Sequence, residues 1–411
     1  MAVIRPFKAM RPAQDVVHLV ASVPYDVVNR EEAAEIVKGN DLSFLRITRS
    51  EVELPETVSP YDESVYQKAK ENFERIRKTA PLIQDDTPRF YLYQLIMGEQ
   101  KQIGIAATFS VQDYNNEVIL KHEKTRKVKE DDRTNHIVTT KAQTGAVFLT
   151  YKGVPEINDA VQKTIDKNEP LYDFTSEDGI RHTVWMVPED YNDIFLFEIG
   201  KVKNLYIADG HHRAASAARS QKVMMDKNPN HNGEEEYNYF FAVLFPAEQL
   251  KILPYNRVVF NLNGNTSEEF INKVEKNFNV EDTDSPEPNA KKEFKMYLDG
   301  KWYLLTPNEN VKQADNVGDN LDASILQNYL LHPVLGIKDP RTDNNIDFIG
   351  GIRGTEELEK LVNSGTAKVA FSMYPVEVHD LINIADAGEV MPPKSTWFEP
   401  KLRDGLLTHI I

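Results

Sequence analysis

Leu205-Tyr206-Ile207-Ala208-Asp209-Gly210-His211-His212-Arg213 is the stretch of sequence that says most about the fold. Its first four residues are apolar and predict a buried strand, and the alanine-rich residues 213–225 predict a helix. A tight turn between a strand and a helix N-terminus binds anions well, because the first N–H groups of a helix lack partners within it. Gly210 suits a turn that needs a left-handed backbone. The stretch therefore predicts an active-site turn that handles phosphate.

The side chains of this turn suit the same chemistry. Arg213 can donate two hydrogen bonds to phosphate oxygens, and His211 and His212 can donate to phosphate or move protons. Asp209 can bind a metal such as Mg²⁺ or orient a histidine. In the simpler alternative, Asp209 caps the helix and one histidine is a structural donor. Because a helix start at the surface tolerates truncation, Arg213→Ala is expected to weaken phosphate binding with little loss of fold.

A second candidate segment is His122-Glu123-Lys124-Thr125, which begins where a strand predicted at residues 118–120 ends. Glu123 is a candidate general base, and His122 can tune it. The alternative is a solvated charge run. A zinc-protease motif is excluded, because it would need a histidine where Arg126 stands. If the two segments form one site, the Glu123 carboxylate should lie within roughly 10 Å of the turn.

A third candidate is the proline-stiffened segment Met391-Pro392-Pro393-Lys394-Ser395-Thr396-Trp397-Phe398-Glu399-Pro400-Lys401. The alternative is a structural segment that packs its two aromatic side chains. Pro24-Tyr25-Asp26 and Pro254-Tyr255-Asn256-Arg257 look like turns by themselves. The anion contacts that the third candidate offers are Lys394, Ser395, Thr396 and Lys401.

Composition narrows the class of protein. The formal net charge of −16 argues against nucleic acid as a partner, because affinity for its backbone comes from Lys and Arg. The chain has no cysteine, so disulfides and thiolate chemistry are excluded. No signal peptide or membrane span is expected, and a cytoplasmic location is predicted. The phosphate-binding loop and the dinucleotide-binding glycine motif are missing, since Gly350-Gly351-Ile352-Arg353-Gly354 has the wrong spacing.

Local patterns predict an α+β fold of mixed sheets with peripheral helices. The proposed domains are residues 1–88, an N-terminal α/β segment, residues 89–265, the catalytic core with an insertion, and residues 266–411, a C-terminal α+β segment. A hairpin is expected around Asp299-Gly300. Extended structure is expected at residues 16–20, 90–96, 103–111, 146–151, 183–187, 194–199, 205–208, 240–244 and 258–262, and helices at residues 30–38, 61–78, 213–225, 267–278, 323–331, 356–362 and 376–385.

The DGHHR string, Asp209 to Arg213, resembles the phosphate-binding signature of the ParB/sulfiredoxin superfamily, and most closely that of its free-serine kinase branch. In that branch an upstream His-Glu pair supplies the base, and His122-Glu123 matches it. About 85 residues separate Glu123 from Asp209, a much longer gap than in serine kinases, and an inserted subdomain would explain it. Over its full length the chain resembles a bacterial family of unassigned function, with the motifs PYD (24–26), HE-x-T (122–125), DR (132–133), DGHHR (209–213) and MPPKST-x-F-x-P-K (391–401).

The resemblance implies a ParB/sulfiredoxin-like core with insertions and an enzyme near serine biosynthesis. Such an enzyme moves a phosphoryl group between serine or O-phosphoserine and ATP, ADP or water, with Mg²⁺ as cofactor. Glu123 would be the base. The alternatives are a ParB-like nucleotide-binding regulatory module without turnover, and a metal enzyme that uses Asp209, His211 and His212 as ligands. The implied catalytic residues are His122, Glu123, Asp209 and His211, and the implied phosphate or nucleotide ligands are Gly210, His212, Arg213, Arg133, Lys394, Ser395, Thr396 and Lys401.

Overall fold

The computed structural model describes residues 2–80 and 82–411, and the chain forms two compact units. The first unit comprises the residues up to Leu250 together with Pro400–Ile411, and the second comprises Lys251–Glu399. Helices and strands are mixed throughout both units, which confirms the α+β class. The division into segments 1–88, 89–265 and 266–411 stays a prediction. Its first boundary falls inside the first unit, and the C-terminal residues belong to that unit as well.

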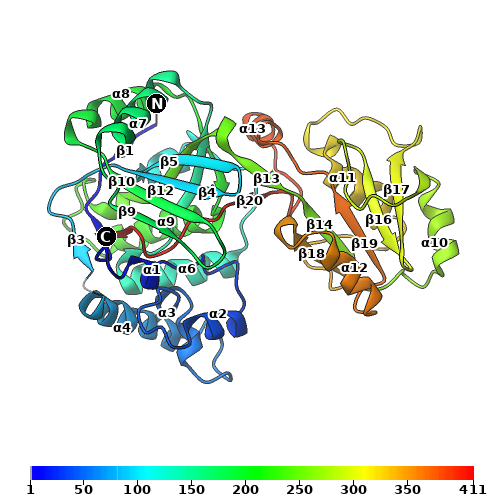
Figure 1. Ribbon diagram of the computed structural model, residues 1–411, viewed down its shortest axis with the longest axis horizontal. Helices are drawn as coiled ribbons and strands as arrows, with labels where there is room; N and C mark the ends of the chain where they lie inside the picture. Colours follow the sequence, from blue (N-terminus) through cyan, green and yellow to red (C-terminus); the bar gives the residue numbers. More distant parts are fainter. Residues whose placement is uncertain (1, 81) are drawn as a thin grey trace. The chain divides into compact units, whose positions relative to one another are not determined.

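A mixed sheet forms the centre of the first unit (Figure 1). Its strands are β1 (Ile4–Arg5), β4 (Tyr91–Met97), β5 (Gln100–Ser110), β6 (Ile119–Leu120), β8 (Val147–Tyr151), β9 (Tyr172–Thr175), β10 (Arg181–Met186), β11 (Leu205–Asp209) and β12 (Tyr239–Pro246). They follow the order β6-β11-β8-β12-β5-β4-β10-β9, and β1 pairs with β5. Strand β11 runs parallel to β6, with Leu205 opposite Ile119. The segments after these two strands therefore leave the sheet at the same edge.

The sheet is covered by helices on both sides. In Figure 1, α7 and α8 lie above the strands, and α6 and α4 lie below them. The helices of this unit are α1 (Val17–Val20), α2 (Arg30–Val37), α3 (Leu45–Thr48), α4 (Glu63–Thr79), α5 (Val111–Asn115), α6 (Lys127–Thr140), α7 (Pro155–Lys167), α8 (Asn192–Lys201) and α9 (His211–Asp226).

A large apolar cluster holds the sheet and its helices together. It joins Leu149 and Phe240 of the sheet to Phe195 of α8 and Ala214 of α9, each at most 1% exposed. Fully burying one such large side chain stabilises the fold by about 1.5–3 kcal/mol. The small alanines of α9 let this helix lie close to β8, which places the start of the helix at the sheet edge.

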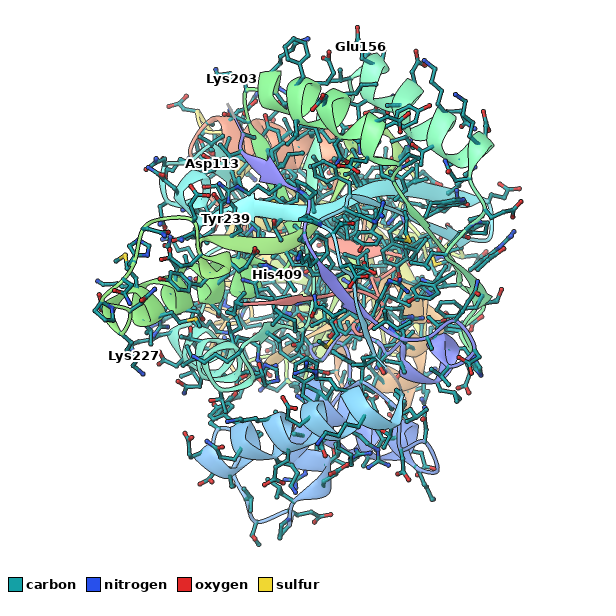
Figure 2. All side chains as sticks on the ribbon, turned by 90° about the vertical axis from the view of Figure 1, so that its left-hand side faces the viewer. Asp113, Glu156, Lys203, Lys227, Tyr239 and His409 are labelled. Carbon is teal, nitrogen blue, oxygen red and sulfur yellow. The ribbon has the colours of Figure 1, made fainter. Side chains whose placement is uncertain are left out.

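A small sheet ties the C-terminus to the first unit. Its strands β2 (Ala9–Arg11), β3 (Ile83–Gln84), β7 (Ala142–Gln143) and β21 (Thr408–Ile410) follow the order β3-β2-β21-β7. His409 Nδ1 lies 3.2 Å from Gln143 Oε1, and Gln143 Nε2 donates to the Tyr239 carbonyl at 3.0 Å. Tyr239 and His409 are both labelled in Figure 2. Through these contacts the last residues of the chain reach the central sheet.

The second unit is built on an antiparallel sheet in the order β15-β17-β16-β19-β14-β18. Asp299 and Gly300 both have positive φ, 49° and 82°, as the predicted tight hairpin requires, so this hairpin is confirmed. The strands of the unit are β13 (Lys251–Leu253), β14 (Tyr255–Val259), β15 (Phe278–Thr283), β16 (Phe294–Leu298), β17 (Lys301–Pro307), β18 (Ile346–Gly350), β19 (Val369–Met373) and β20 (Trp397–Glu399). Its helices are α10 (Ser267–Val274), α11 (Asp322–Leu326), α12 (Glu356–Asn363) and α13 (Val378–Asp386).

Two local predictions were wrong, and among the helices of more than five residues one was not anticipated. Residues 16–20 and 194–199 were expected to be extended, but they form α1 and most of α8. In α8 the buried Phe195 and Ile199 are four residues apart, so the helical period decides against local β propensity. The missed helix is α7, which has a proline in its first turn. In the described part of the chain, every helix is too short or too polar to cross a bilayer.

Candidate functional site

The turn between β11 and α9 has the predicted form of strand, glycine and helix. Gly210 has φ 90°, in the left-handed region, and precedes the first helical residue, His211. A Cβ atom at Gly210 would lie 3.4 Å from the Val147 Cα of the neighbouring strand. That is an ordinary van der Waals contact, so it is the backbone conformation that favours glycine. The helix begins two residues before its predicted start at Arg213.

The two histidines of the turn hold the segment between β6 and α6, and we call this arrangement the histidine clamp. His211 Nε2 accepts a hydrogen bond from the backbone N–H of His122 at 3.4 Å. His212 Nε2 accepts one from the backbone N–H of Arg126 at 3.0 Å, directly before α6 begins. The loop that carries Glu123 is thus fixed at both ends by consecutive residues of α9.

Glu123 lies beside the histidine clamp. Its Oε2 is 3.9 Å from His211 Nδ1, which confirms the expected proximity of the two motifs. Since His211 Nε2 accepts from His122, the imidazole proton is assigned to Nδ1, which faces the carboxylate. The His211 side chain is 5% exposed and that of Glu123 is 38% exposed. A half-exposed acid thus lies beside a buried imidazole.

Burial keeps the clamp histidines neutral. It lowers the pKa of His122 to about 4, and the rings of His122 and His211 meet edge to face with centroids 4.4 Å apart. Burial and the neighbouring His122 hold the pKa of His211 well below its usual value, and burial also lowers the pKa of His212. These rings therefore act as hydrogen-bonding groups near pH 7.

Asp209 and Lys401 form an ion pair at the end of β11. Lys401 Nζ lies 2.9 Å from Asp209 Oδ2, and Asp209 Oδ1 accepts the Gly210 N–H at 2.7 Å. Burial opposes ionisation of Asp209, yet the charges of Lys401 and Arg213 hold its pKa well below the usual value. The structure thus brings Lys401 of the C-terminal motif to the turn.

The donor set for a metal is poor at this turn. Both oxygens of Asp209 already contact cationic or N–H donors, and His211 and His212 each accept from a different backbone N–H. Among residues 2–80 and 82–411, no three His, Cys, Asp or Glu side chains are placed to share an ion. The three-ligand metal hypothesis therefore lacks a matching arrangement, and Mg²⁺ at Asp209 stays a prediction.

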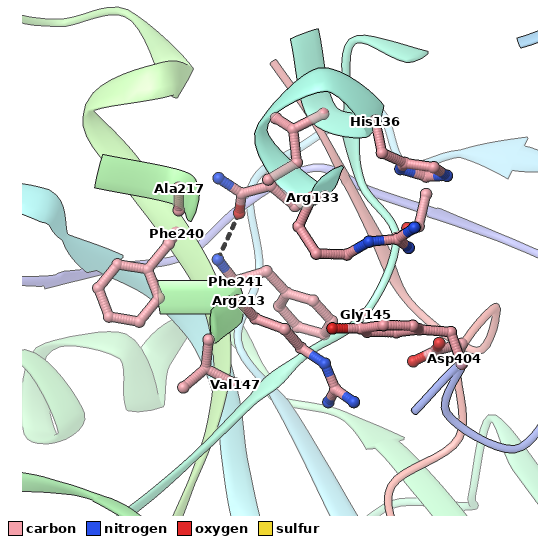
Figure 3. Close-up of a pocket in the computed structure, with 13 residues that line it drawn as sticks. Arg133, His136, Gly145, Val147, Arg213, Ala217, Phe240, Phe241 and Asp404 are labelled. Atoms are coloured by element: carbon pink, nitrogen blue, oxygen red, sulfur yellow. Dashed lines mark hydrogen bonds between the residues drawn. The ribbon is translucent and has the colours of Figure 1, made fainter. Parts of the chain in front are cut away.

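Arg213 lines a small cavity of about 30 Å³, which we call the arginine cavity (Figure 3). Its guanidinium donates to the Ala146 carbonyl and to Asp26 Oδ1, both at 2.8 Å. The side chain is 9% exposed, so the expectation that Arg213 lies at the surface was wrong. Burial opposes the charge, but Asp26 and Asp404 keep the pKa of Arg213 above its ordinary value. Its predicted phosphate role stays a prediction.

Arg133 lines the same cavity, together with Tyr25 and Asp404. Arg133 donates to Asp132 Oδ2 at 3.0 Å and lies over the Tyr25 ring, 4.2 Å from its centroid. Burial raises the pKa of the Asp404 carboxyl to about 7, despite the neighbouring Arg213. The arginine cavity is thus a buried cluster of opposite charges with little free volume, and phosphate binding by Arg133 stays a prediction.

Sequence reasoning missed two acids of this cluster. Asp26 lies in the PYD motif, which looked like a turn by itself, and it is the ion-pair partner of Arg213. Asp404 follows the C-terminal motif, and no pattern around it signalled a role. For Asp26 the available signal was its place in a motif shared with the resembled family.

The other predicted anion ligands of the C-terminal motif belong to the second unit. Ser395 is buried, and its Oγ donates to the Pro392 carbonyl at 2.8 Å. Lys394 Nζ lies over the Tyr255 ring, 5.4 Å from its centroid, and Thr396 directly precedes β20. Phosphate binding by Lys394, Ser395 and Thr396 stays a prediction.

A family model described as a protein of unknown function, DUF1015, matches residues 4–324, which is more than half of the chain. The chain belongs to the DUF1015 family. The clamp, the Asp209–Lys401 pair and the arginine cavity are thus features of a DUF1015 protein. None of the curated proteins matches the sequence.

Several solved structures are similar to this DUF1015 protein, and each match covers 74% of the DUF1015 chain. A conserved hypothetical protein from Pyrococcus furiosus has a TM-score of 0.37 and 12% identity, over 94% of its own length. A free serine kinase in complex with AMP has a TM-score of 0.37 and 13% identity, over 91% of its length. SbnI from Staphylococcus aureus, truncated at its C-terminus, has a TM-score of 0.37 and 11% identity, over 87% of its length.

Proposed function

We propose that this protein is a phosphotransferase that moves a phosphoryl group between a nucleotide and serine or O-phosphoserine. The observation that carries the proposal is the position of Glu123, held 3.9 Å from His211 by a loop that the histidine clamp fixes at both ends. A base that exchanges a proton with a hydroxyl must be held precisely and must remain accessible. The DGHHR resemblance supports the choice of phosphate chemistry and of serine, and it assigns a ParB/sulfiredoxin-like core to the first unit.

In the serine-phosphorylating direction, Glu123 accepts the proton of the serine hydroxyl as its oxygen attacks the terminal phosphorus of ATP. The new O–P bond forms while the bond to the leaving phosphate oxygen breaks, which yields O-phosphoserine and ADP. In the reverse direction Glu123 returns the proton, and with water as acceptor the products are serine and phosphate. His211 remains neutral, and its Nδ1 lies 3.9 Å from the carboxylate.

The phosphate is assigned to the start of α9, where backbone N–H groups follow Gly210. Lys401 adds a positive charge beside Asp209 at the same end of β11. Mg²⁺ bound with the nucleotide would neutralise charge on the phosphates, and no step above is assigned to it.

The test is to incubate the purified protein with serine and ATP, with O-phosphoserine and ADP, and with O-phosphoserine alone, each with and without Mg²⁺. Serine, ATP and phosphate are then assayed. Glu123→Gln keeps the shape of the side chain but cannot accept a proton, so turnover should fall by about 10²–10⁴-fold while substrate binding persists. Glu99→Gln, at an exposed hairpin turn, is the matched control and should keep full turnover.

Two outcomes would contradict the proposal. Full turnover in Glu123→Gln would remove Glu123 from the mechanism. If the wild type turned over neither compound, while nucleotide binding changed its association with a partner, the protein would be a ParB-like regulatory module.

A further inference from the structure

A second cavity, of about 290 Å³, lies within the second unit beside β14 and α11. Its size is close to the lower end of pockets that hold small organic ligands. Both positive and apolar side chains line it, among them Arg257, Lys338 and Arg341, and Leu331, Phe348 and Pro392. We call it the Arg257 cavity. Its role is inferred independently of the proposed function.

Arg257 is unusual because it is buried without an acidic partner. It is 4% exposed and lies on β14, a strand within the sheet between β19 and β18. Its guanidinium donates to the backbone carbonyls of Tyr255 and Lys394, and it lies 5.5 Å from the centroid of the Phe348 ring. Within residues 2–80 and 82–411 it forms no ion pair, and Asp322 acts on its charge only from beyond ion-pair distance. A buried guanidinium whose charge is not balanced in this way is costly.

The other charges of the cavity add to the positive potential. Arg341 is paired with Asp339 at 2.8 Å, so these two balance each other and leave the charge of Lys338 beside that of Arg257. Burial lowers the pKa of Arg257 to about 10, so the guanidinium is still charged at neutral pH. The lining therefore carries a net positive charge.

The cavity also joins two sequence motifs that the proposed function leaves unused. Arg257 ends the Pro254-Tyr255-Asn256-Arg257 segment, and Pro392 and Pro393 of the C-terminal motif line the same cavity. The Arg257 guanidinium reaches the Lys394 carbonyl at 3.3 Å, so the two segments meet beside the cavity.

We propose that the Arg257 cavity binds a small organic anion, with its phosphate or carboxylate group on Arg257 and Lys338. The apolar body of the ligand would lie against Leu331, Phe348 and the two prolines. The planar guanidinium can donate two parallel hydrogen bonds to such a group, and the ligand would supply the direct anionic partner that Arg257 lacks within the fold.

The test is calorimetric titration of the full chain with phenyl phosphate, benzoate and inorganic phosphate. Phenyl phosphate should bind more tightly than inorganic phosphate, since only the former has an apolar body, and benzoate reports whether a carboxylate suffices. Arg257→Met should weaken binding of the organic anion by about 10–100-fold, the value of a charge-assisted hydrogen bond. Lys338→Ala should weaken it by about 2–5-fold, because Lys338 is exposed. Lys301→Ala, an exposed lysine outside the cavity, is the control and should change nothing.

The stability of Arg257→Met separates this proposal from a structural role. If Arg257 is kept for a ligand, the variant should have the Tm of the wild type or a higher one, because an unbalanced buried charge is gone. A lower Tm would assign Arg257 to holding the Tyr255 and Lys394 carbonyls and would overturn the proposal. Equal affinity of phenyl phosphate for the wild type, Arg257→Met and Lys338→Ala would overturn it as well.

Discussion

The histidine clamp and the arginine cavity are built from adjacent residues of one turn, yet their chemistry differs. On the clamp side a partly exposed carboxylate, Glu123, lies next to a neutral imidazole. On the cavity side the buried Arg213 is paired with Asp26, and burial raises the pKa of the neighbouring Asp404 carboxyl to about 7. The difference shows that polar side chains of one motif can serve separate roles, one chemical and one structural. An accessible acid can exchange protons with a substrate, whereas a balanced buried cluster stabilises the position of the turn.

The largest effect is expected from Arg213→Ala, which removes the buried positive charge of the arginine cavity. It removes the ion-pair partner of Asp26 and the donor to the Ala146 carbonyl. We expect the free energy of unfolding to fall by about 3–5 kcal/mol, as for other buried pairs that lose one partner. Urea denaturation followed by circular dichroism measures it. Arg181→Ala, which breaks the exposed pair with Asp173, is the control and should cost at most about 1 kcal/mol. Equal losses in both variants would contradict a structural role for Arg213.

Asp404→Asn tests the arginine cavity through the pH dependence of the free energy of unfolding. The folded protein keeps a proton on Asp404 up to about pH 7, whereas the unfolded chain releases it near its ordinary pKa. Between about pH 4 and pH 7 the folded state therefore binds more protons, so this group makes the free energy of unfolding fall as pH rises through that window. Asn cannot titrate. Relative to the wild type, the variant should gain on the order of 3 kcal/mol from pH 4 to pH 7.

Urea denaturation at intervals across this pH range measures the gain. Asp339→Asn is the control, because the pKa of Asp339 is lowered to about 2 by its bonds to Arg341. That carboxylate is ionised in both the folded and the unfolded state above pH 4. The free energy of unfolding of Asp339→Asn should therefore change with pH in parallel with that of the wild type. If the free energy of unfolding of Asp404→Asn ran parallel to that of the wild type across this pH range, Asp404 would be ionised in the folded protein.

His211→Ala tests the clamp side. The truncation leaves the buried His122 N–H without its acceptor, which costs about 1–3 kcal/mol of unfolding free energy. It also frees the Glu123 carboxylate from its neighbour, so we expect kcat to fall with little change in the KM for nucleotide. Thermal unfolding and steady-state kinetics measure the two effects. His18→Ala, an exposed histidine, is the control. Unchanged kcat in His211→Ala would separate His211 from the action of Glu123.

The smallest effect is expected from His212→Ala, which releases only the other end of the loop. His212 accepts the Arg126 N–H just before α6, much as a capping side chain does at a helix start. Loss of this single bond should cost about 0.5–1.5 kcal/mol. The same thermal unfolding series measures it. A cost equal to that of His211→Ala would mean that the two histidines hold the loop equally.

The sequence alone predicted much of the local structure for simple physical reasons. An apolar run, a glycine and an alanine-rich segment predict the β11 turn and α9, and Asp299-Gly300 predicts its hairpin. The pairing of Glu123 with the turn was also expected, but from motif resemblance rather than from spacing. The predictions of extended structure at residues 16–20 and 194–199 were wrong. Apolar and β-branched side chains suit a strand and a helix equally when the packing partner is not known.

What only the tertiary structure decided is how the side chains of the motif divide between two environments. The parallel pairing of β6 with β11 places residues about 85 positions apart at one sheet edge, and no local pattern records that pairing. The sequence by itself determined that Asp209 to Arg213 forms a turn with charged and imidazole groups. It could not show that His211 faces Glu123 while Arg213 faces Asp26, since burial and partners arise from contacts between segments distant in the chain.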